Sequence, residues 1–597
     1  MSATALADYP AVQAPVGGHF LIASGDPGTV FTPEDFTEAQ LQALATTKRF
    51  VEAEVVPRIA EFERKEPGLA RQLIEQSAEL GLLGILVPER HDGLELDITT
   101  QMLVAEAMGG YASFSTTYGA HAGIGTLPLV FFGTEEQRQR YLPRMVTGEL
   151  LAAYCLSEPQ AGSDSQNSLT RAELSSDGKH YVLNGQKMWI SNGGWADLYT
   201  VFAKVDGEQF TAFLVEREFD GVQPGAEEHK MGLRGSSTTA LYLDNVHVPV
   251  ENVLGEVGRG HVIAFNVLNM GRLELAAACV GGAKDSISDS AAYALQRKAF
   301  GQPIANFGAI RQKLADMAVR VFASESMVYR TSGMIDARLA DVSWDRPEAA
   351  RQTLKAVEEY AIECSIAKVY VSEVLDFTTD EAVQIHGGYG YHEDYAVERN
   401  YRDSRINRIF EGTNEINRLL TTGMLLKRAG QGRLDLLKAV AQAAGNSPDA
   451  AAAAGDSAGL GKEQGIVDRI RKATLCMMGL AYQRLGDSLD RQQEVAAAVG
   501  DMAAEVYTSE SALLRTAKLT ADGRGGNARD MLTVLLQQSL GTVRELGGLV
   551  IGASGDGAEL ENTWSSFLQL TGSVPSDLPA ARDRIAARVL ESGSYSV

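Results

Sequence analysis

The chain has few cysteines and no cluster of them. Its 597 residues include four, Cys155, Cys279, Cys364 and Cys476, which lie far apart. This spacing excludes a disulfide framework and the paired-cysteine patterns of structural zinc sites. We therefore expect no metal site and a chain suited to a reducing cytoplasm.

Basic residues are also scarce. Lys and Arg number 54 against 77 Asp and Glu, which gives a formal net charge of -23 at pH 7. Such acidity argues against nucleic acid as a partner, and any association with an anionic membrane should be weak at most. Residues 1–20 lack the basic start and apolar core of a signal peptide, so we expect a bacterial cytoplasmic location with no targeting signal.

Long apolar runs are absent, and none approaches the roughly 20 residues that cross a bilayer. No G-x-G-x-x-G fingerprint follows a predicted strand, so the sequence indicates no Rossmann nucleotide site. The composition is that of an ordinary globular protein, with 45% hydrophobic and 22% charged residues. A chain of this length and composition has enough apolar material for several domains.

Helical periodicity dominates residues 36–150, which we interpret as an N-terminal helical domain. Apolar residues recur at three- and four-residue spacing in 37–64, 68–83 and 99–108, and a helix rich in small residues is expected at 111–132. The preceding residues, 1–35, show no periodicity and are expected to form an irregular arm.

Residues 151–260 are β-rich and form the expected middle domain. Asp-Gly and Asn-Gly turns separate segments that alternate or are rich in β formers, and we expect antiparallel strands at 168–174, 180–190, 198–205 and 209–216.

Helical patterns return in residues 261–430 and again in 466–597, the latter an appended helical domain. The low-complexity segment between them, 431–465, is interpreted as a linker.

Glu411 is the carboxylate in the most unusual setting. It lies between an apolar pair and Gly412. Apolar neighbours desolvate a carboxylate and raise its pKa toward that of a working base, and glycine allows close approach of the backbone to a ligand. Thr413 is a candidate N-cap, which would place Glu411 just outside a helix N-terminus. On spacing alone, an exposed loop glutamate is the plainer alternative.

Five stretches resemble, in this order, the motifs of the acyl-CoA dehydrogenases. They are YCLSEPQAGSDSQ from Tyr154, LNGQKMWISNG from Leu183, RKAFGQPI from Arg297, QIHGGYGY from Gln384 and RIFEGTNEINR from Arg408. The segment after about residue 431 makes the chain most similar to the very-long-chain subgroup, which has an extra C-terminal helical domain. The resemblance implies a mainly α fold with a central antiparallel β domain: an α-helical N domain, a β-barrel-like middle domain, a four-helix-bundle-like C domain and the appended domain.

The resemblance also implies FAD-dependent α,β-dehydrogenation of a long-chain acyl-CoA to the trans-2-enoyl-CoA in β-oxidation, with electrons passed to an electron-transfer flavoprotein. Glu411 matches the catalytic base. A relative subgroup keeps its base at the position of Gly271, which is vacant here, and the nearest other carboxylate, Glu274, is interpreted as a surface or paired charge. An acyl-CoA oxidase and a catalytically silent scaffold protein of the same family remain alternatives.

The same resemblance assigns the FAD contacts. The isoalloxazine would be held by Tyr154, Leu156, Ser157, Trp189 and Ser191, with Thr413 and Glu415 beside the base, while Arg297, Phe300, Gln384 and Gly388 would reach the FAD of the partner subunit. The chain departs from relatives in two of these regions. Glu415 replaces a common glutamine, and Gly308 replaces a flavin-contacting glutamine of some relatives.

Substrate contacts follow in the same way. CoA would be bound by Ser163, Arg272 and Asn269, the last in place of an aspartate of some relatives. Thr116 and Ala120 stand one helical turn apart, where shorter-chain relatives carry larger polar side chains, and therefore predict a deep acyl pocket. A homodimer is implied, and the acidic segment 439–461 carries no basic residue, so we expect at most weak membrane association.

Overall fold

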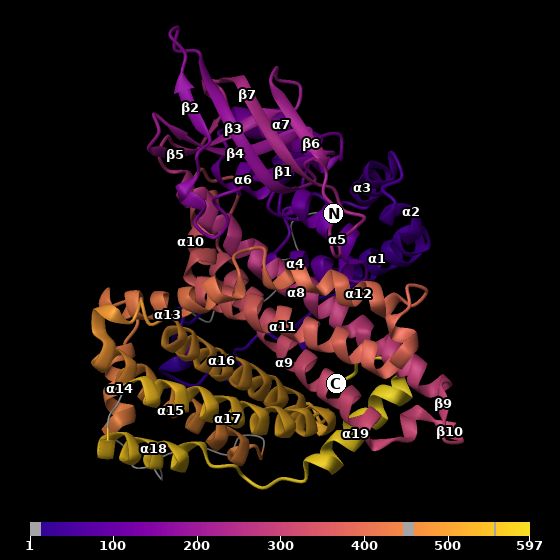
Figure 1. Ribbon diagram of the computed structural model, residues 1–597, viewed down its shortest axis with the longest axis vertical. Helices are drawn as coiled ribbons and strands as arrows, with labels where there is room; N and C mark the ends of the chain where they lie inside the picture. Colours follow the sequence, from indigo (N-terminus) through magenta and orange to yellow (C-terminus); the bar gives the residue numbers. More distant parts are fainter. Residues whose placement is uncertain (1–13, 446–458, 555–556) are drawn as a thin grey trace.

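The computed structural model describes residues 14–445, 459–554 and 557–597. Figure 1 shows the β domain at the top, the long helices of residues 260–430 across the middle and the appended helices below them. The mainly helical fold with a central β domain is confirmed.

The N-terminal domain is helical but more divided than its periodicity suggests. The segment 37–64 is not one helix, because the chain passes through a π-helical turn at Val51–Val55 and then a 3₁₀ turn at Val56–Arg58, where Pro57 lacks an N–H. The segment 111–132 also divides, at Gly123. The helices are α1 (Glu38–Phe50), α2 (Ile59–Glu63), α3 (Leu69–Glu79), α4 (Ile98–Met108), α5 (Ala112–Ala122), α6 (Leu127–Phe132) and α7 (Glu135–Val146).

The central sheet is mixed, and the prediction of a purely antiparallel domain is wrong in this respect. The order is β6-β7-β3-β2-β4-β5-β8, and both β1 and β2 run parallel to β4, while the other pairs are antiparallel. The strands are β1 (Ala152–Cys155), β2 (Arg171–Leu174), β3 (His180–Ser191), β4 (Leu198–Val205), β5 (Gln209–Glu216), β6 (Val222–Glu227), β7 (Thr238–Pro249) and β8 (Val253–Leu254).

The strand expected at 168–174 begins only at Arg171. The backbone N–H groups of Leu169 and Thr170 donate to the Glu158 carboxylate, at 2.6 and 3.1 Å, instead of to a neighbouring strand. A side chain therefore takes the place of the first ladder bonds.

The helices of residues 260–430 pack around α8, which crosses the middle of Figure 1. Within the described residues, only α8 is long and apolar enough to cross a membrane, contrary to the expectation that no segment is, yet 72% of its apolar window is buried in the protein. It is thus the central core helix. The elements of this region are α8 (Gly260–Gln296), the hairpin of β9 (Lys298–Ala299) and β10 (Gln302–Pro303), α9 (Gly308–Leu339), α10 (Ala349–Glu359), α11 (Ala361–His386), α12 (Ala396–Ser404) and α13 (Asn414–Gly430).

The segment 431–465 is not a simple linker. It contains α14 (Leu436–Gly445), whose Leu436 and Ala439 are buried, and the start of α15 at Gly461. The low-complexity sequence misled the prediction because its apolar residues are mostly alanine, which forms helices well. Residues 446–458, the rest of the predicted linker, lie outside the described residues.

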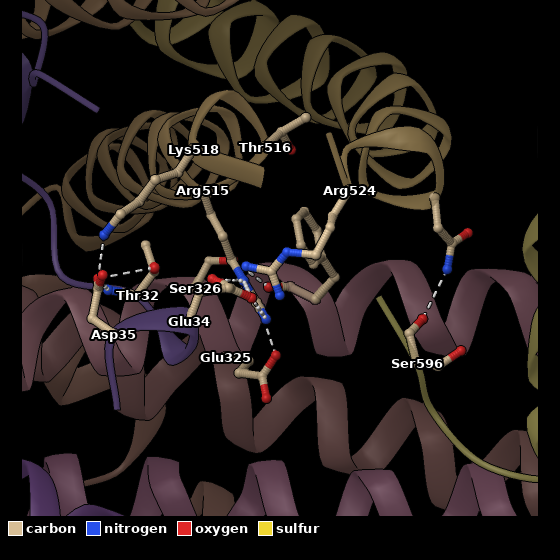
Figure 2. A network of polar contacts seen from close by, with 12 residues as sticks. Thr32, Glu34, Asp35, Glu325, Ser326, Arg515, Thr516, Lys518, Arg524 and Ser596 are labelled. Carbon is tan, nitrogen blue, oxygen red and sulfur yellow. Dashed lines mark hydrogen bonds and ion pairs between the residues drawn. The ribbon is translucent and has the colours of Figure 1, made fainter. Parts of the chain in front are cut away.

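The appended domain packs on the underside of α9 and α13 through α16. It consists of α15 (Gly461–Leu485), α16 (Gln493–Ala521), α17 (Gly526–Ser554), α18 (Gly557–Thr571) and α19 (Leu578–Ser592). A buried ionic network joins α16 to α9 and to the N-terminal arm. Arg515 lies between Glu34, at 2.8 Å, and Glu325, at 2.5 Å (Figure 2), and Tyr595 near the C-terminus also donates to Glu325.

The described part of the N-terminal arm, residues 14–35, is therefore not a loose extension. Phe20 and Leu21 are buried, and Glu34 and Asp35 pair with Arg515 and Lys518 of α16. The arm fills a seam between the appended domain and the rest of the chain.

Candidate active site

Glu411 occupies a strained turn directly before α13. Its φ is +58° and that of Gly412 is +80°, so a non-glycine residue takes the left-handed conformation. Thr413 caps the helix by accepting a hydrogen bond from the N–H of Ile416 at 3.3 Å. The predicted position of Glu411 outside a helix N-terminus is confirmed. The exposed-loop alternative is wrong, because the carboxylate oxygen Oε2 is buried.

The carboxylate of Glu411 has an environment suited to a proton acceptor. Among the described residues its Oε2 has no hydrogen-bond partner. Burial raises the pKa of Glu411 to about 7, although the positive charges of Arg272 and Lys368 oppose this shift. Gly271 of α8 leaves the space for the carboxylate, because a Cβ there would lie 2.8 Å from Oε2.

Arg272 and Lys368 hold the backbone of this turn. Arg272 Nε donates to the carbonyl oxygen of Glu411 at 3.2 Å, and Lys368 Nζ donates to the carbonyl oxygen of Gly412 at 2.9 Å. Both side chains thus stabilise the strained backbone. Lys368 was missed by the sequence reasoning, since it lies mid-helix in α11, without a motif.

A cavity of about 150 Å³ begins at Glu411 and follows one face of α8. Thr116 and Ala120 of α5 lie in its wall, as expected for the acyl pocket. The α8 residues that line it recur at three- and four-residue spacing: Gly271, Glu274, Leu275, Ala278, Cys279, Gly282 and Asp285. From Gly271 to Asp285 this face extends roughly 21 Å, at about 1.5 Å per residue. Small residues dominate it, so the space stays open.

Glu274 is not the surface or paired charge that the sequence suggested. It is 8% exposed, lies in the cavity wall and forms no ion pair with any described residue. Its Oε1 accepts a hydrogen bond from Gln101 Nε2 at 3.1 Å. Burial raises the pKa of Glu274 to about 8. The prediction failed because every residue of α8 from Asn269 to Ala277 is buried, so this part of the helix has no solvent face for a charge.

The residues expected at the isoalloxazine lie together beside the cavity. Ser191 lines it, and Trp189 at the end of β3 is 59% exposed with φ +62°, which presents the indole outward. Tyr154, whose hydroxyl is buried without a partner among the described residues, and Leu156 are buried. Ser157 keeps its side chain available while its carbonyl accepts from the N–H of Met188. An exposed flat indole beside a cavity that contains a base fits FAD.

The loop that carries Ser163 is held by a buried ion pair that the motif reading missed. Lys187 Nζ lies 2.7 Å from Glu158 Oε1, and both side chains are almost fully buried. The same carboxylate accepts the N–H groups of Leu169 and Thr170. Ser163 itself is exposed in this loop.

The other predicted substrate contacts are internal. Asn269 and Arg272 are buried, and Arg272 Nη1 donates to Asn269 Oδ1 at 2.8 Å. Their contact with CoA stays a prediction, whereas their effect on the Glu411 turn is direct.

Four predicted FAD residues do not reach the Glu411 site of the same chain. Phe300 is 95% exposed, and Arg297 is exposed with its guanidinium carbon 5.3 Å from the Tyr389 ring centroid. Gln384 and Gly388 are exposed where α11 ends.

The remaining predicted flavin positions lie at helix starts. Thr413 caps α13, Glu415 is exposed in the first turn of α13, and Gly308 begins α9, where an added Cβ would meet no neighbouring atom. Within the described residues no group of three His, Cys, Asp or Glu side chains could hold a metal ion.

Family models match four parts of the chain. The acyl-CoA dehydrogenase N-terminal domain matches residues 37–149, the middle domain 153–246, and two models described as the acyl-CoA dehydrogenase C-terminal domain match 258–425 and 469–567. The second C-terminal model lies in the appended domain.

Relatives and a solved structure of the same family match this chain. A probable acyl-CoA dehydrogenase of Bacillus subtilis (strain 168) is 44% identical over 97% of this chain and 98% of its own. The mitochondrial very long-chain specific acyl-CoA dehydrogenase of Rattus norvegicus is 44% identical over 57% of this chain, and that match spans about half of the relative's length, 51%. The crystal structure of an acyl-CoA dehydrogenase complexed with FAD from Bacillus anthracis has a TM-score of 0.94 and 42% identity, covering 98% of this chain and 100% of that one. The chain therefore belongs to the acyl-CoA dehydrogenase family and is an FAD-dependent oxidoreductase.

Proposed function

We propose that the enzyme oxidises long-chain fatty acyl-CoA to trans-2-enoyl-CoA and passes the electrons to an electron-transfer flavoprotein. The observation that supports a long acyl chain is the cavity, whose α8 lining residues extend from Gly271 to Asp285, a helix length of roughly 21 Å. Thr116 and Ala120 leave its wall open where a larger residue would close it. The relatives named very long-chain specific support the same assignment.

In this proposal Glu411 removes a proton from the carbon next to the thioester carbonyl. A carboxylate with a pKa near 7 is partly ionised at neutral pH and accepts protons better than an ordinary glutamate. The N–H of Glu411 donates to no described residue, so it is free to stabilise the enolate oxygen as charge develops. Arg272 and Lys368 keep that N–H and the carboxylate in place.

FAD, when bound, supplies the hydride acceptor for the β-carbon. Trp189, Ser191, Tyr154, Leu156 and Ser157 would hold its ring system, with Thr413 and Glu415 beside the base. Arg297, Phe300, Gln384 and Gly388 are exposed and do not line this cavity in one chain, and they would bind the FAD of a second copy. We therefore propose a homodimer, which also covers the exposed ring of Phe300.

A cytoplasmic location completes the proposal. All four cysteines are free, three of them buried, and none lies in a disulfide. This pattern suits a reducing compartment.

Anaerobic titration of the purified flavoprotein tests the activity. We expect saturated acyl-CoAs of about 12 to 18 carbons to bleach the bound flavin, and Glu411→Gln to retain FAD while losing reduction by about 10²–10⁴-fold. Rapid reduction of that variant would place the base elsewhere. Absence of reduction in the wild-type protein with every acyl-CoA would favour the silent scaffold alternative.

The acceptor needs a separate measurement. Reduced enzyme should be reoxidised much faster by an electron-transfer flavoprotein than by dissolved oxygen. Fast reoxidation by oxygen alone, with hydrogen peroxide formed, would instead establish the oxidase alternative.

A further inference from the structure

The acyl cavity contains a carboxyl group that the proposed reaction does not use. Glu274 lies one turn after Gly271 on the face of α8 that lines the cavity, so it follows the base along the path of the acyl chain. A wall meant only for methylene groups would carry a leucine or methionine here, because an apolar chain gives a buried carboxyl no hydrogen bond in return.

The surroundings of Glu274 are built to keep the group in place. Gln101 of α4, itself 2% exposed, donates to Oε1 at 3.1 Å. Gly119 of α5 and Gly123, which follows that helix, also lie against the carboxyl group, and a Cβ on Gly123 would lie 2.3 Å from Oε2. Three helices thus accommodate this one side chain.

One oxygen of this carboxyl remains available. Oε2 accepts no hydrogen bond from any described residue, and no described Lys or Arg forms an ion pair with Glu274. A carboxyl group can pair with a hydroxyl in either protonation state, as acceptor when ionised and as donor when neutral. This available oxygen therefore suits an alcohol better than a methylene chain.

The distance from the base sets where such an alcohol would lie. Three residues of α8 span about 4.5 Å, and an extended chain advances about 1.2 Å per bond, so Glu274 lies about four bonds beyond the carbon at Glu411. We propose that Glu274 and Gln101 form a recognition point for acyl-CoA substrates that carry a hydroxyl group at about carbons 5 to 7 of the acyl chain. This inference rests on the proposed acyl-CoA dehydrogenation and narrows its substrate class.

A positional series of hydroxylated substrates tests the inference. The rate of flavin reduction at limiting substrate is compared for palmitoyl-CoA and for its 6-hydroxy and 12-hydroxy derivatives. We expect 6-hydroxypalmitoyl-CoA to match or exceed palmitoyl-CoA and to exceed the 12-hydroxy compound by about tenfold, because the former hydroxyl lies level with the available oxygen of Glu274. Equal rates for the two hydroxylated chains, or a 6-hydroxy compound slower than both others, would overturn the inference.

Two variants at the same position separate recognition from packing. Glu274→Gln keeps a hydrogen-bonding group and should keep the preference, whereas Glu274→Met should lower the 6-hydroxy rate relative to palmitoyl-CoA by about tenfold and leave the 12-hydroxy ratio unchanged. Gln101→Leu removes the group that orients the carboxyl and should act in the same direction. Bound FAD, read from its absorbance, verifies that each variant is folded.

The experiments distinguish failure of the proposed dehydrogenation from failure of hydroxyl recognition by Glu274. If every acyl-CoA reduces the flavin but Glu274→Met leaves all ratios as in wild type, the recognition point is wrong and the dehydrogenation stands. If no acyl-CoA reduces the flavin, the proposed function and this inference both fail.

Discussion

Gly271 and Glu411 compete for the same space: a Cβ on residue 271 would lie 2.8 Å from Oε2 of the Glu411 carboxylate. The two residues come from distant parts of the chain, the middle of α8 and the turn before α13. The vacancy at position 271 is therefore a requirement for the observed position of Glu411.

This relationship predicts the outcome of a single added methyl group. Gly271→Ala should displace the Glu411 carboxylate and lower the rate of flavin reduction by about 10²-fold, because small misplacements of reacting groups are costly. Ala278→Gly, on the same face of α8 but two turns away, is the control and should lose far less.

The double variant Gly271→Glu with Glu411→Gly should recover part of the rate lost in Glu411→Gly, since a carboxylate from residue 271 reaches the same place. Stopped-flow measurements that found no recovery would show that the backbone of Glu411 matters more than the location of its carboxylate.

The pH dependence of flavin reduction should report Glu411. Its pKa is raised to about 7, and only the ionised form accepts a proton, so the rate should rise with pH through about 7 and level off above it. Lys368 lowers this pKa by its charge. Lys368→Met should accordingly shift the rise to higher pH. A profile that stays flat between pH 5.5 and 8.5 in both proteins would be inconsistent with this assignment.

The width of the acyl cavity predicts chain-length preference. Thr116→Gln with Ala120→Glu places two larger side chains in the wall and should move the optimum toward shorter acyl-CoAs, since each excluded methylene loses about 0.8 kcal/mol of burial. Rates with acyl-CoAs of 4 to 18 carbons measure the shift. An unchanged profile would mean that the chain follows another path.

The buried ion pairs of Arg515 predict a loss of stability when the contacts between the appended domain and the rest of the chain are broken. Its side chain is 3% exposed and pairs with Glu34 and Glu325, so Arg515→Ala should destabilise the protein by about 3–5 kcal/mol, because two buried carboxylates lose a partner. Arg584 is the matched control: it pairs with Asp530 but is 58% exposed, and Arg584→Ala should cost less than about 1 kcal/mol. Urea unfolding compares the two. Similar midpoints would contradict the structural role of the network.

Removal of the appended domain should alter assembly. The full-length protein is expected to be a homodimer, and deletion from Gly432 onward should give larger species or aggregates, because the surfaces of α9 and α13 under α16 become exposed. Light scattering distinguishes these states. A tetrameric full-length protein or a well-behaved truncated dimer would show that the domain does not shield that surface.

The sequence predicted those parts of the fold that depend on local pattern. Two strands, β4 and β5, have the expected bounds, and Thr413 caps its helix as expected. The parallel pairing of β1 and β2 with β4 was missed because register between distant strands leaves no local periodicity.

The local sequence pattern did not predict which side chains act through long-range contacts. Lys368 and Gln101 look like ordinary helix residues, and Glu274 looked like a surface charge, although the part of α8 that carries it is buried. The motif residues were found by resemblance, and their roles toward FAD and CoA stay predictions.

The contact of Arg515 with the N-terminal arm can form only late in the synthesis of the chain. Glu34 and Arg515 are 481 residues apart, so a ribosome adding roughly 5–20 residues per second needs roughly 24–96 s to make the second after the first. Throughout that time Glu34 emerges from the ribosome without its partner, and Glu325 also lacks Tyr595. The surface of α9 that carries Glu325 therefore lacks these contacts until the appended domain has been translated. A ribosome that stalls before it reaches residue 515 would leave Glu34 and Glu325 without Arg515, on a face that chaperones can bind.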